Sequence, residues 1–217
     1  MNSVVSEKLY ISQKLGIPYE NLSQSYLQKA VALATQQTIV FPLQVSQVPA
    51  ASQTVLDQLL NLNDEFVLTH FNVHLRTVAS DSPTTAQLQA TIPYTYVDTN
   101  VFTLTNSANV GAVFNGSLSF TIDRKDFIPA FDCRSFYRVP VAQSATNADY
   151  TTSGIKRTNG YDNGLYSYFV SEPVKITGRQ TISVEIDLGA SINLDDSSVT
   201  NYAVFAAKGY LVVNAKN

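Results

Sequence analysis

The segment Thr181-Ile182-Ser183-Val184-Glu185-Ile186-Asp187-Leu188 alternates polar and apolar residues without a break. Successive side chains of a β-strand point to opposite faces, so this alternation places the four aliphatic residues on one face. β-Branched residues dominate that apolar face, as is typical of strands. The segment therefore predicts a strand that lies half buried against a hydrophobic core.

The last long apolar segment of the chain, residues 202–213, differs because it is apolar on both faces. Its sequence is Tyr202-Ala203-Val204-Phe205-Ala206-Ala207-Lys208-Gly209-Tyr210-Leu211-Val212-Val213. A strand of this kind requires cover on both sides, either at the centre of a sheet within a sandwich or beneath another subunit. We therefore expect it to be a central strand.

Several other segments have the composition of strands. The expected strands span residues 38–45, 66–78, 87–97, 109–115, 117–122, 135–141 and 165–177. The expected apolar face of 66–78 consists of Val67, Phe71, Val73 and Leu75. Since no helices alternate with these strands, we predict an all-β fold, an antiparallel β-sandwich or jelly roll, rather than βαβ units.

The N-terminal residues differ from the rest of the chain. Ser6 is the expected cap of a short helix that ends near Gly16. A second helix is expected at about 20–34, where Leu22, Tyr26, Ala30 and Leu33 recur at spacings of three and four. This apolar stripe is narrow, so the helix would be stable only when docked on its own body or on a neighbour.

These features predict two parts, a helical arm or appendage at 1–35 and a β-sandwich body at 36–217. Leu22, Tyr26 and Leu33 are the candidate interface residues of the arm. The alternative is an ordinary N-terminal helix that packs on its own domain.

The composition is poor in charge and rich in aromatic residues. Only 14% of the 217 residues are charged, and the chain has 12 Tyr, 11 Phe and no Trp. Charges are depleted and aromatic residues enriched at interface cores, so this composition favours a protein whose outer surface is largely interface. Many β-rich binding domains share this composition, which leaves that alternative open.

Charge and cysteine content limit the classes of partner. The net charge is −3 and the sequence has no basic stripe, so we expect no direct sequence-specific binding to nucleic acid. A single cysteine excludes an intrachain disulfide and fits synthesis in a reducing compartment. The N-terminus lacks the pattern of a signal peptide, and no apolar segment approaches the length of a membrane span.

His70 and His74 are the only histidines, and their H-x-x-x-H spacing would form a metal pair on a helix. Their neighbours instead predict a strand, on which residues four apart lie about 13 Å from each other. We therefore expect both on the polar face of that strand with Asn72 and Arg76, and we expect no shared metal.

Other candidate chemistry is equally weak. Arg134 could lower the pKa of the Cys133 thiol, but a single cysteine near apolar residues is usually packed in a core. Asp195-Asp196 and Asp162-Asn163 lack the spacing of a calcium loop and are better explained as turns. The sequence predicts no catalytic residue, no cofactor and no bound metal.

The segment 142–164 is an unusually long polar loop that contains several Gly, Asn and Asp residues. Loops of this length are uncommon in compact domains and often carry function. Tyr150, Tyr161 and Tyr166 lie in or beside it and are candidate contacts for a partner or ligand.

A docked N-terminal segment, a Thr/Asn/Ser-rich β body and a final apolar strand together resemble virion structural proteins of bacteriophages, with jelly-roll capsid subunits as the nearest type. The resemblance implies a non-enzymatic subunit, made in the host cytoplasm and incorporated in the virion, that assembles with copies of itself and with other virion proteins. The alternative is a receptor- or carbohydrate-binding β-sandwich of a phage fibre. A third class, an enzyme with dispersed carboxylates, stays open.

Overall fold

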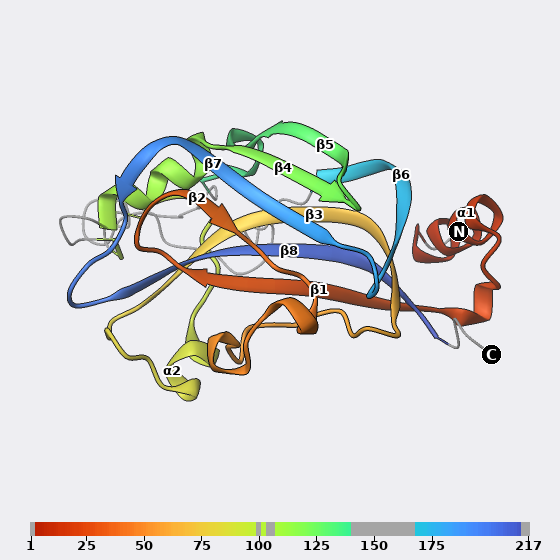
Figure 1. The fold of residues 1–217 in the computed structure, drawn as a ribbon, viewed down its shortest axis with the longest axis horizontal. Helices are drawn as coiled ribbons and strands as arrows, with labels where there is room; N and C mark the ends of the chain where they lie inside the picture. The colour runs from red at the N-terminus through yellow and green to blue at the C-terminus, as the bar shows by residue number, and fades with distance from the viewer. Residues whose placement is uncertain (1–2, 99–100, 103–106, 140–167, 214–217) are drawn as a thin grey trace, which may run out of the picture.

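The computed structural model describes residues 3–98, 101–102, 107–139 and 168–213, and they form two antiparallel β-sheets packed face to face (Figure 1). The first sheet has the order β1 (Leu22–Ala32), β8 (Thr200–Val212), β3 (Glu65–Val78) and β6 (Tyr168–Thr177). The second has the order β2 (Thr35–Val40), β7 (Ile182–Asn193), β4 (Ser117–Ile122) and β5 (Lys125–Asp132). The all-β prediction is confirmed.

The pairing of the strands follows a simple rule. β1 pairs with β8, β2 with β7, β3 with β6 and β4 with β5, all antiparallel. The eight strands thus correspond to one long hairpin that is rolled up. The pairs β1–β8 and β3–β6 lie in the first sheet, and the pairs β2–β7 and β4–β5 lie in the second. This is the strand order of a jelly roll.

The two strands on which the sequence prediction rests behave as expected. In β7, Ile182, Val184 and Ile186 are buried in the core between the sheets. β8 is a central strand that pairs with β1 on one side and with β3 on the other. One face of β8 contributes Phe205 to the core between the sheets, while Val204 on the other face is also buried.

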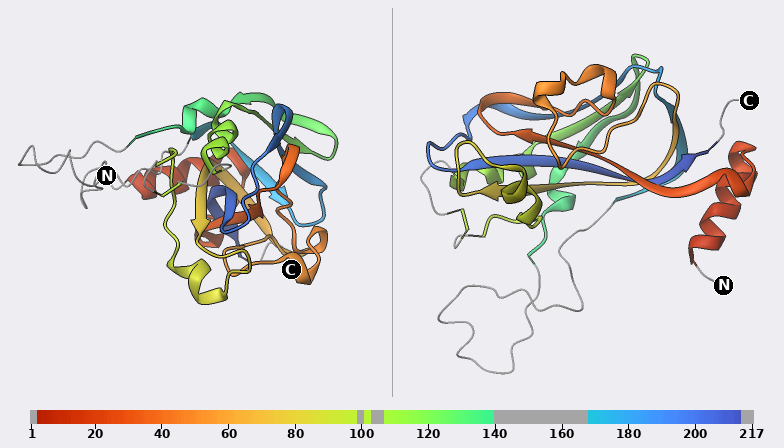
Figure 2. Two further views of the ribbon diagram at one scale, coloured as in Figure 1. Left: turned by 90° about the vertical axis from the view of Figure 1, so that its left-hand side faces the viewer. Right: turned by 90° about the horizontal axis from the view of Figure 1, so that it is seen from below.

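The cover on the outer face of β8 comes from the chain itself. α1 (Ser3–Leu15) lies at one end of the sandwich (Figures 1 and 2). Its Ile11 packs in one buried cluster with Val67 and Tyr210. At the other end, Leu88 of α2 (Thr85–Ala90) packs against Val204. Among the described residues, no helix is long and apolar enough to cross a membrane.

The core between the sheets is built around aromatic rings. The Phe71 ring of β3 stacks on Phe205 of β8 at a centroid distance of 6.0 Å. Phe205 in turn meets the edge of Phe120 from β4 in the opposite sheet, at 6.3 Å. Rings from both sheets therefore interlock, and such pairs add to the stabilisation from burial alone.

The helix predicted at 20–34 is wrong, because residues 22–32 form strand β1 in full register with β8. The spacing of Leu22, Tyr26 and Ala30 is four, an even number, so these residues share one face of a strand just as they would share one face of a helix. Leu33 lies just past the end of the strand and is buried in the main core. Within 1–35, the helical part is therefore α1, together with the short 3₁₀ helix η1 (Tyr19–Asn21).

Three shorter strand predictions are also wrong. The segment 87–97 contains most of α2, which begins with a capping box in which Thr84 and Gln87 exchange hydrogen bonds. The segment 109–115 belongs to the 3₁₀ helix η4 (Ser107–Asn115). The described part of 135–141 overlaps the 3₁₀ helix η5 (Cys133–Phe136) and then continues without regular structure.

The long strand predicted at 66–78 is confirmed as β3, but its expected apolar face is partly wrong. A β-bulge between Leu68 and His70 shifts the alternation, so Val67 faces outward towards α1 while Phe71 faces the main core. Gly209 of β8 lies opposite Leu68. A Cβ added to Gly209 would lie only 1.8 Å from the Val67 carbonyl oxygen. Only glycine fits this close approach.

Candidate functional site

The two histidines lie on the outward face of β3, as predicted, and His74 is almost fully buried there. His74 Nδ1 lies 3.1 Å from Asn72 Oδ1, and Arg76 Nε lies 3.5 Å from His74 Nε2. Burial, reinforced by the Arg76 charge, lowers the pKa of His74 to about 3. His74 is therefore neutral at physiological pH and forms part of the packed structure.

His70 contributes to the contact between α1 and the sheet. Its Nδ1 lies 3.9 Å from Glu7 Oε1, while the Tyr210 hydroxyl donates to Glu7 Oε2 at 3.0 Å. Burial lowers the pKa of His70, against the attraction of Glu7, and the Lys208 charge lowers it further. The described residues contain no cluster of three or more His, Cys, Asp or Glu side chains that could hold a metal ion.

Cys133 is packed in the core rather than exposed on the surface. Its side chain is fully buried, and burial together with the Asp132 charge raises the pKa of the thiol to about 12. Arg134 therefore does not activate it. A thiol with this pKa is a poor nucleophile at neutral pH.

The predicted acidic turns and contact residues have mixed outcomes. Asp196 bridges Val199 in a tight turn, as expected for turn chemistry. Leu22 and Leu33 are buried in the fold, whereas Tyr26 is 51% exposed on the outer face of the first sheet. Tyr150, Tyr161, Tyr166, the pair Asp162-Asn163 and the loop 142–164 lie outside the described residues.

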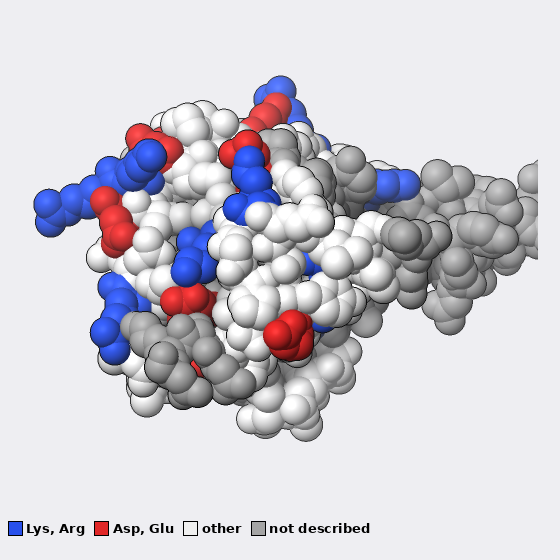
Figure 3. Space-filling model, turned by 90° about the vertical axis from the view of Figure 1, so that its right-hand side faces the viewer, with Lys and Arg blue, Asp and Glu red and all other residues white. Residues whose placement is uncertain are grey.

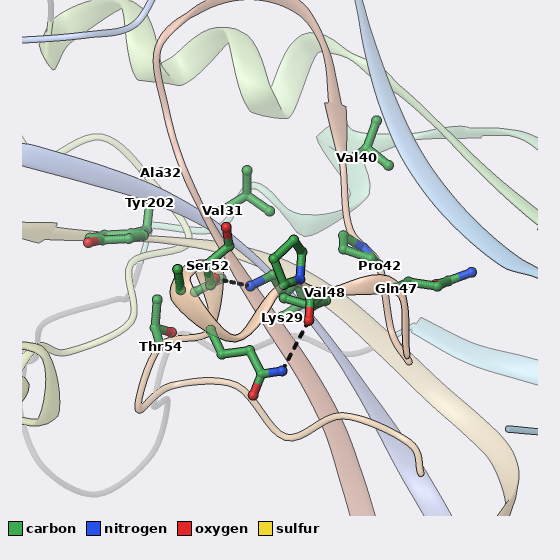
Figure 4. A pocket seen from close by; sticks show the side chains of 14 residues that line it. Lys29, Val31, Ala32, Val40, Pro42, Gln47, Val48, Ser52, Thr54 and Tyr202 are labelled. Carbon is green, nitrogen blue, oxygen red and sulfur yellow. Dashed lines mark hydrogen bonds between the residues drawn. The ribbon is translucent and has the colours of Figure 1, made fainter. Parts of the chain in front are cut away.

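A cavity of about 400 Å³ lies on one flank of the sandwich, between the edge strands β1 and β2 and the segment 47–54 (Figure 4). We call this surface the flank pocket. Its walls are mostly aliphatic side chains and prolines, with a few neutral polar groups and the buried side chain of Lys29. The lining includes Val31, Ala32, Val40, Pro42, Val48, Pro49 and Tyr202.

A buried ion pair lies at the base of the flank pocket. Lys29 Nζ is 2.6 Å from Asp57 Oδ2, and their side chains are only 5% and 3% exposed. Lys29 also donates to the Ser52 carbonyl oxygen at 3.1 Å (Figure 4). Asp57 accepts further hydrogen bonds from the backbone N–H groups of Ala30 and Thr54. The pair is neutral overall and fastens the segment 52–57 to the edge of β1.

The sequence prediction missed this pair, although one signal was present. Lys29 and Asp57 are the two charged residues that border the stretch 30–56, which contains no Asp, Glu, Lys, Arg or His at all. An isolated lysine at one end and an isolated aspartate at the other are the groups that would neutralise each other if the stretch folded back on itself.

A second cavity, of about 570 Å³, lies beside η4 and η5. Its lining combines side-chain amides, a guanidinium and aromatic rings. The polar and aromatic members are Asn109, Asn115, Arg134, Phe114 and Tyr137. Phe114 and Tyr137 meet edge to face at a centroid distance of 5.5 Å. We call this cavity the amide pocket.

On the face at the α1 end of the molecule, positively and negatively charged side chains are mixed and do not form a patch of one sign. Figure 3 shows Lys, Arg, Asp and Glu side chains scattered there among uncharged residues. Lys14 pairs with Glu172 at 3.3 Å, and Lys175 with Glu65 at 3.2 Å. This face lacks the basic stripe with which proteins bind nucleic acid.

Comparisons with protein-family models, with curated proteins and with solved structures found no match to this chain. The fold and the surfaces described above are therefore the features that bear on function.

Proposed function

We propose that this chain is a non-enzymatic virion structural protein that assembles through subunit interfaces into or onto a bacteriophage capsid. The observation that carries the proposal is the jelly-roll strand order of the two sheets. Viral capsid subunits are a major group of proteins with this fold, along with lectins and cupins. The same fold can host unrelated functions, so the surface distinguishes between them.

The surface supports an assembling protein. Charged residues are few, and large apolar side chains are exposed on α1, β1, β2 and several loops. Those with the largest exposure are Leu62, Tyr26, Tyr137, Val40 and Ile92. Depletion of charge and exposure of apolar and aromatic side chains are typical of interface cores.

The residues that most often carry catalysis have structural roles here. His74 is neutral and buried beside Asn72, and Cys133 is a protonated core thiol. His70 lies beside Glu7 of α1. These roles support a non-enzymatic protein, and they disfavour a cupin-like metal site on the described sheets.

Electron microscopy of the concentrated protein tests this proposal. We expect regular assemblies, either closed shells or ordered patches, that form from the purified chain or on addition of the other virion proteins. A preparation that shows only isolated single subunits under both conditions would contradict it.

The amide pocket favours a second candidate, a receptor- or carbohydrate-binding module of a phage fibre. Side-chain amides, a guanidinium and aromatic rings are the groups that pair with hydroxyls and stack on apolar ligand faces. A glycan-binding screen that compares the wild type with Tyr137→Ala tests this candidate. Glycan binding that Tyr137→Ala abolishes would favour it over the capsid proposal.

A further inference from the structure

The flank pocket lies mostly on a segment of the chain, residues 30–56, that has no charged side chain. Residues 30–56 include β2, most of the pocket lining and the exposed side chains of Val40, Val45 and Val55. Lys29 also contributes to the lining, but it is almost fully buried and is neutralised by Asp57. A partner with charged groups would lose their hydration in the pocket and gain no compensating ion pair from its lining. The surface formed by the flank pocket and the neighbouring edge of β2, which we call the flank, therefore fits a partner surface that is itself uncharged.

The backbone of β2 adds a second requirement. Among the described residues, β2 is an edge strand that pairs only with β7. The Phe41 N–H donates to the Val184 carbonyl at 2.8 Å, so the backbone groups of Val40, one residue earlier, point away from β7 and towards the flank. Such groups are satisfied best by another extended chain.

The other three edge strands carry protection that β2 lacks. β5 contains Pro129 and β6 contains Pro173, and proline cannot donate to an added strand. The outer edge of β1 exchanges two hydrogen bonds of 2.8 Å with Gln58. Within the described chain, no bridge of this kind covers β2, and residues 35–40 contain neither proline nor a charged residue. Charge and proline are the usual means by which native edges avoid pairing.

We propose that the flank is a self-association surface, on which β2 pairs antiparallel with β2 of a second copy of this chain. A twofold axis brings the same uncharged face onto itself, so each copy supplies the neutral surface and the extended edge that the other requires. The Val40 side chain and the mouth of the flank pocket are then buried in the contact. The inference rests on the proposed function, because it names one of the contacts through which the subunit assembles.

The test is a comparison of two lysine substitutions at exposed apolar positions. Val40 is 47% exposed on the β2 edge, and Leu62 is 55% exposed on a turn outside the charge-free segment. We expect Val40→Lys to weaken self-association, measured by sedimentation, by at least about tenfold, because a lysine on an edge strand opposes pairing with a second strand. Leu62→Lys is expected to associate like the wild type.

Three further experiments keep the test decisive. Thr38→Lys, also exposed on β2, replaces Val40→Lys if circular dichroism shows that the latter is unfolded. A synthetic peptide with the sequence of residues 35–41 is expected to compete with association, since it offers the same extended edge. Association between neutral faces is also expected to persist at high salt, unlike association through ion pairs.

The outcomes separate this inference from the proposed function. If the wild type assembles and a folded Val40→Lys variant assembles equally well, the inference is overturned but the proposed function is not. A wild type that stays monomeric at every concentration would overturn the inference, and it would contradict the proposed function as well only if the other virion proteins also failed to assemble it. A wild type that is monomeric but binds the 35–41 peptide would show that β2 receives a different extended partner, and it would also overturn self-association.

Discussion

Lys29 Nζ lies 2.6 Å from Asp57 Oδ2, and this buried ion pair joins edge strand β1 to the segment that walls the flank pocket. A buried charge is costly unless it has a partner, so each member of the pair depends on the other. The hydrogen bonds that Asp57 accepts from the backbone N–H groups of Ala30 and Thr54 extend the contact along the strand edge. The pair thus holds in place the surface that we assign to self-association.

Replacement of Asp57 by Ala is expected to destabilise the fold by roughly 3–5 kcal/mol, because it leaves the Lys29 ammonium buried and unpaired. Urea unfolding followed by circular dichroism measures the change. The exposed pair Lys14–Glu172 provides the control, and Lys14→Ala is expected to cost no more than about 1 kcal/mol. Equal effects of the two substitutions would show that the buried pair has no special role.

His74 is expected to make stability depend on pH. Its pKa falls from 6.5 in the unfolded chain to about 3 in the fold, so the unfolded state binds the proton more tightly. The stabilisation from neutral His74 is complete above pH 6.5 and is lost as the pH falls towards 3, at about 1.4 kcal/mol per pH unit.

The measurement is the free energy of unfolding at pH 7 and at pH 5, for the wild type and for His74→Gln. The carboxylates titrate in both proteins, so the difference between the two slopes isolates the histidine. We expect a shallower slope for the variant. Parallel slopes would mean that His74 is not buried in its neutral form.

Ile11 is expected to anchor α1. Its side chain is fully buried against Val67 and Tyr210, and Ile11→Ala should destabilise the protein by about 2–4 kcal/mol. Leu9 in the same helix is 41% exposed, and Leu9→Ala should change stability by no more than about 0.5 kcal/mol. Thermal unfolding compares the two, and a loss of equal size would place the packed face of α1 elsewhere.

Cys133 is expected to be unreactive in the folded protein. Its thiol is buried, with a pKa raised to about 12, so a thiol reagent at pH 8 should label it only after denaturant is added. The labelled fraction of the protein is measured by mass spectrometry with and without denaturant. Rapid, complete labelling of the native protein would refute the packed position.

The fold was predictable where one face of a strand is buried and the other is not. The alternation from Ile182 to Leu188 allows only one face to be buried, and the two-sided apolar segment of β8 allows only a central position. By contrast, the even spacing of Leu22, Tyr26 and Ala30 fits a helix and a strand equally. Pairing with β8, a contact distant in sequence, decides between them.

The candidate site was much less predictable. The contact between Lys29 and Asp57 spans 28 residues and depends on how the segment after β2 returns to β1. The bulge that turns Val67 outward has no clear signal in the sequence. The capping box of Thr84 and Gln87, in contrast, follows a recognisable pattern and marks the start of α2.

Sedimentation velocity of the purified wild-type chain, across protein concentration and salt, tests the central claim most directly. The account predicts association that increases with concentration, continues beyond the dimer and persists at high salt. A single monomeric species at every concentration would contradict self-association through β2, and the same result in the presence of the other virion proteins would contradict the proposed assembly.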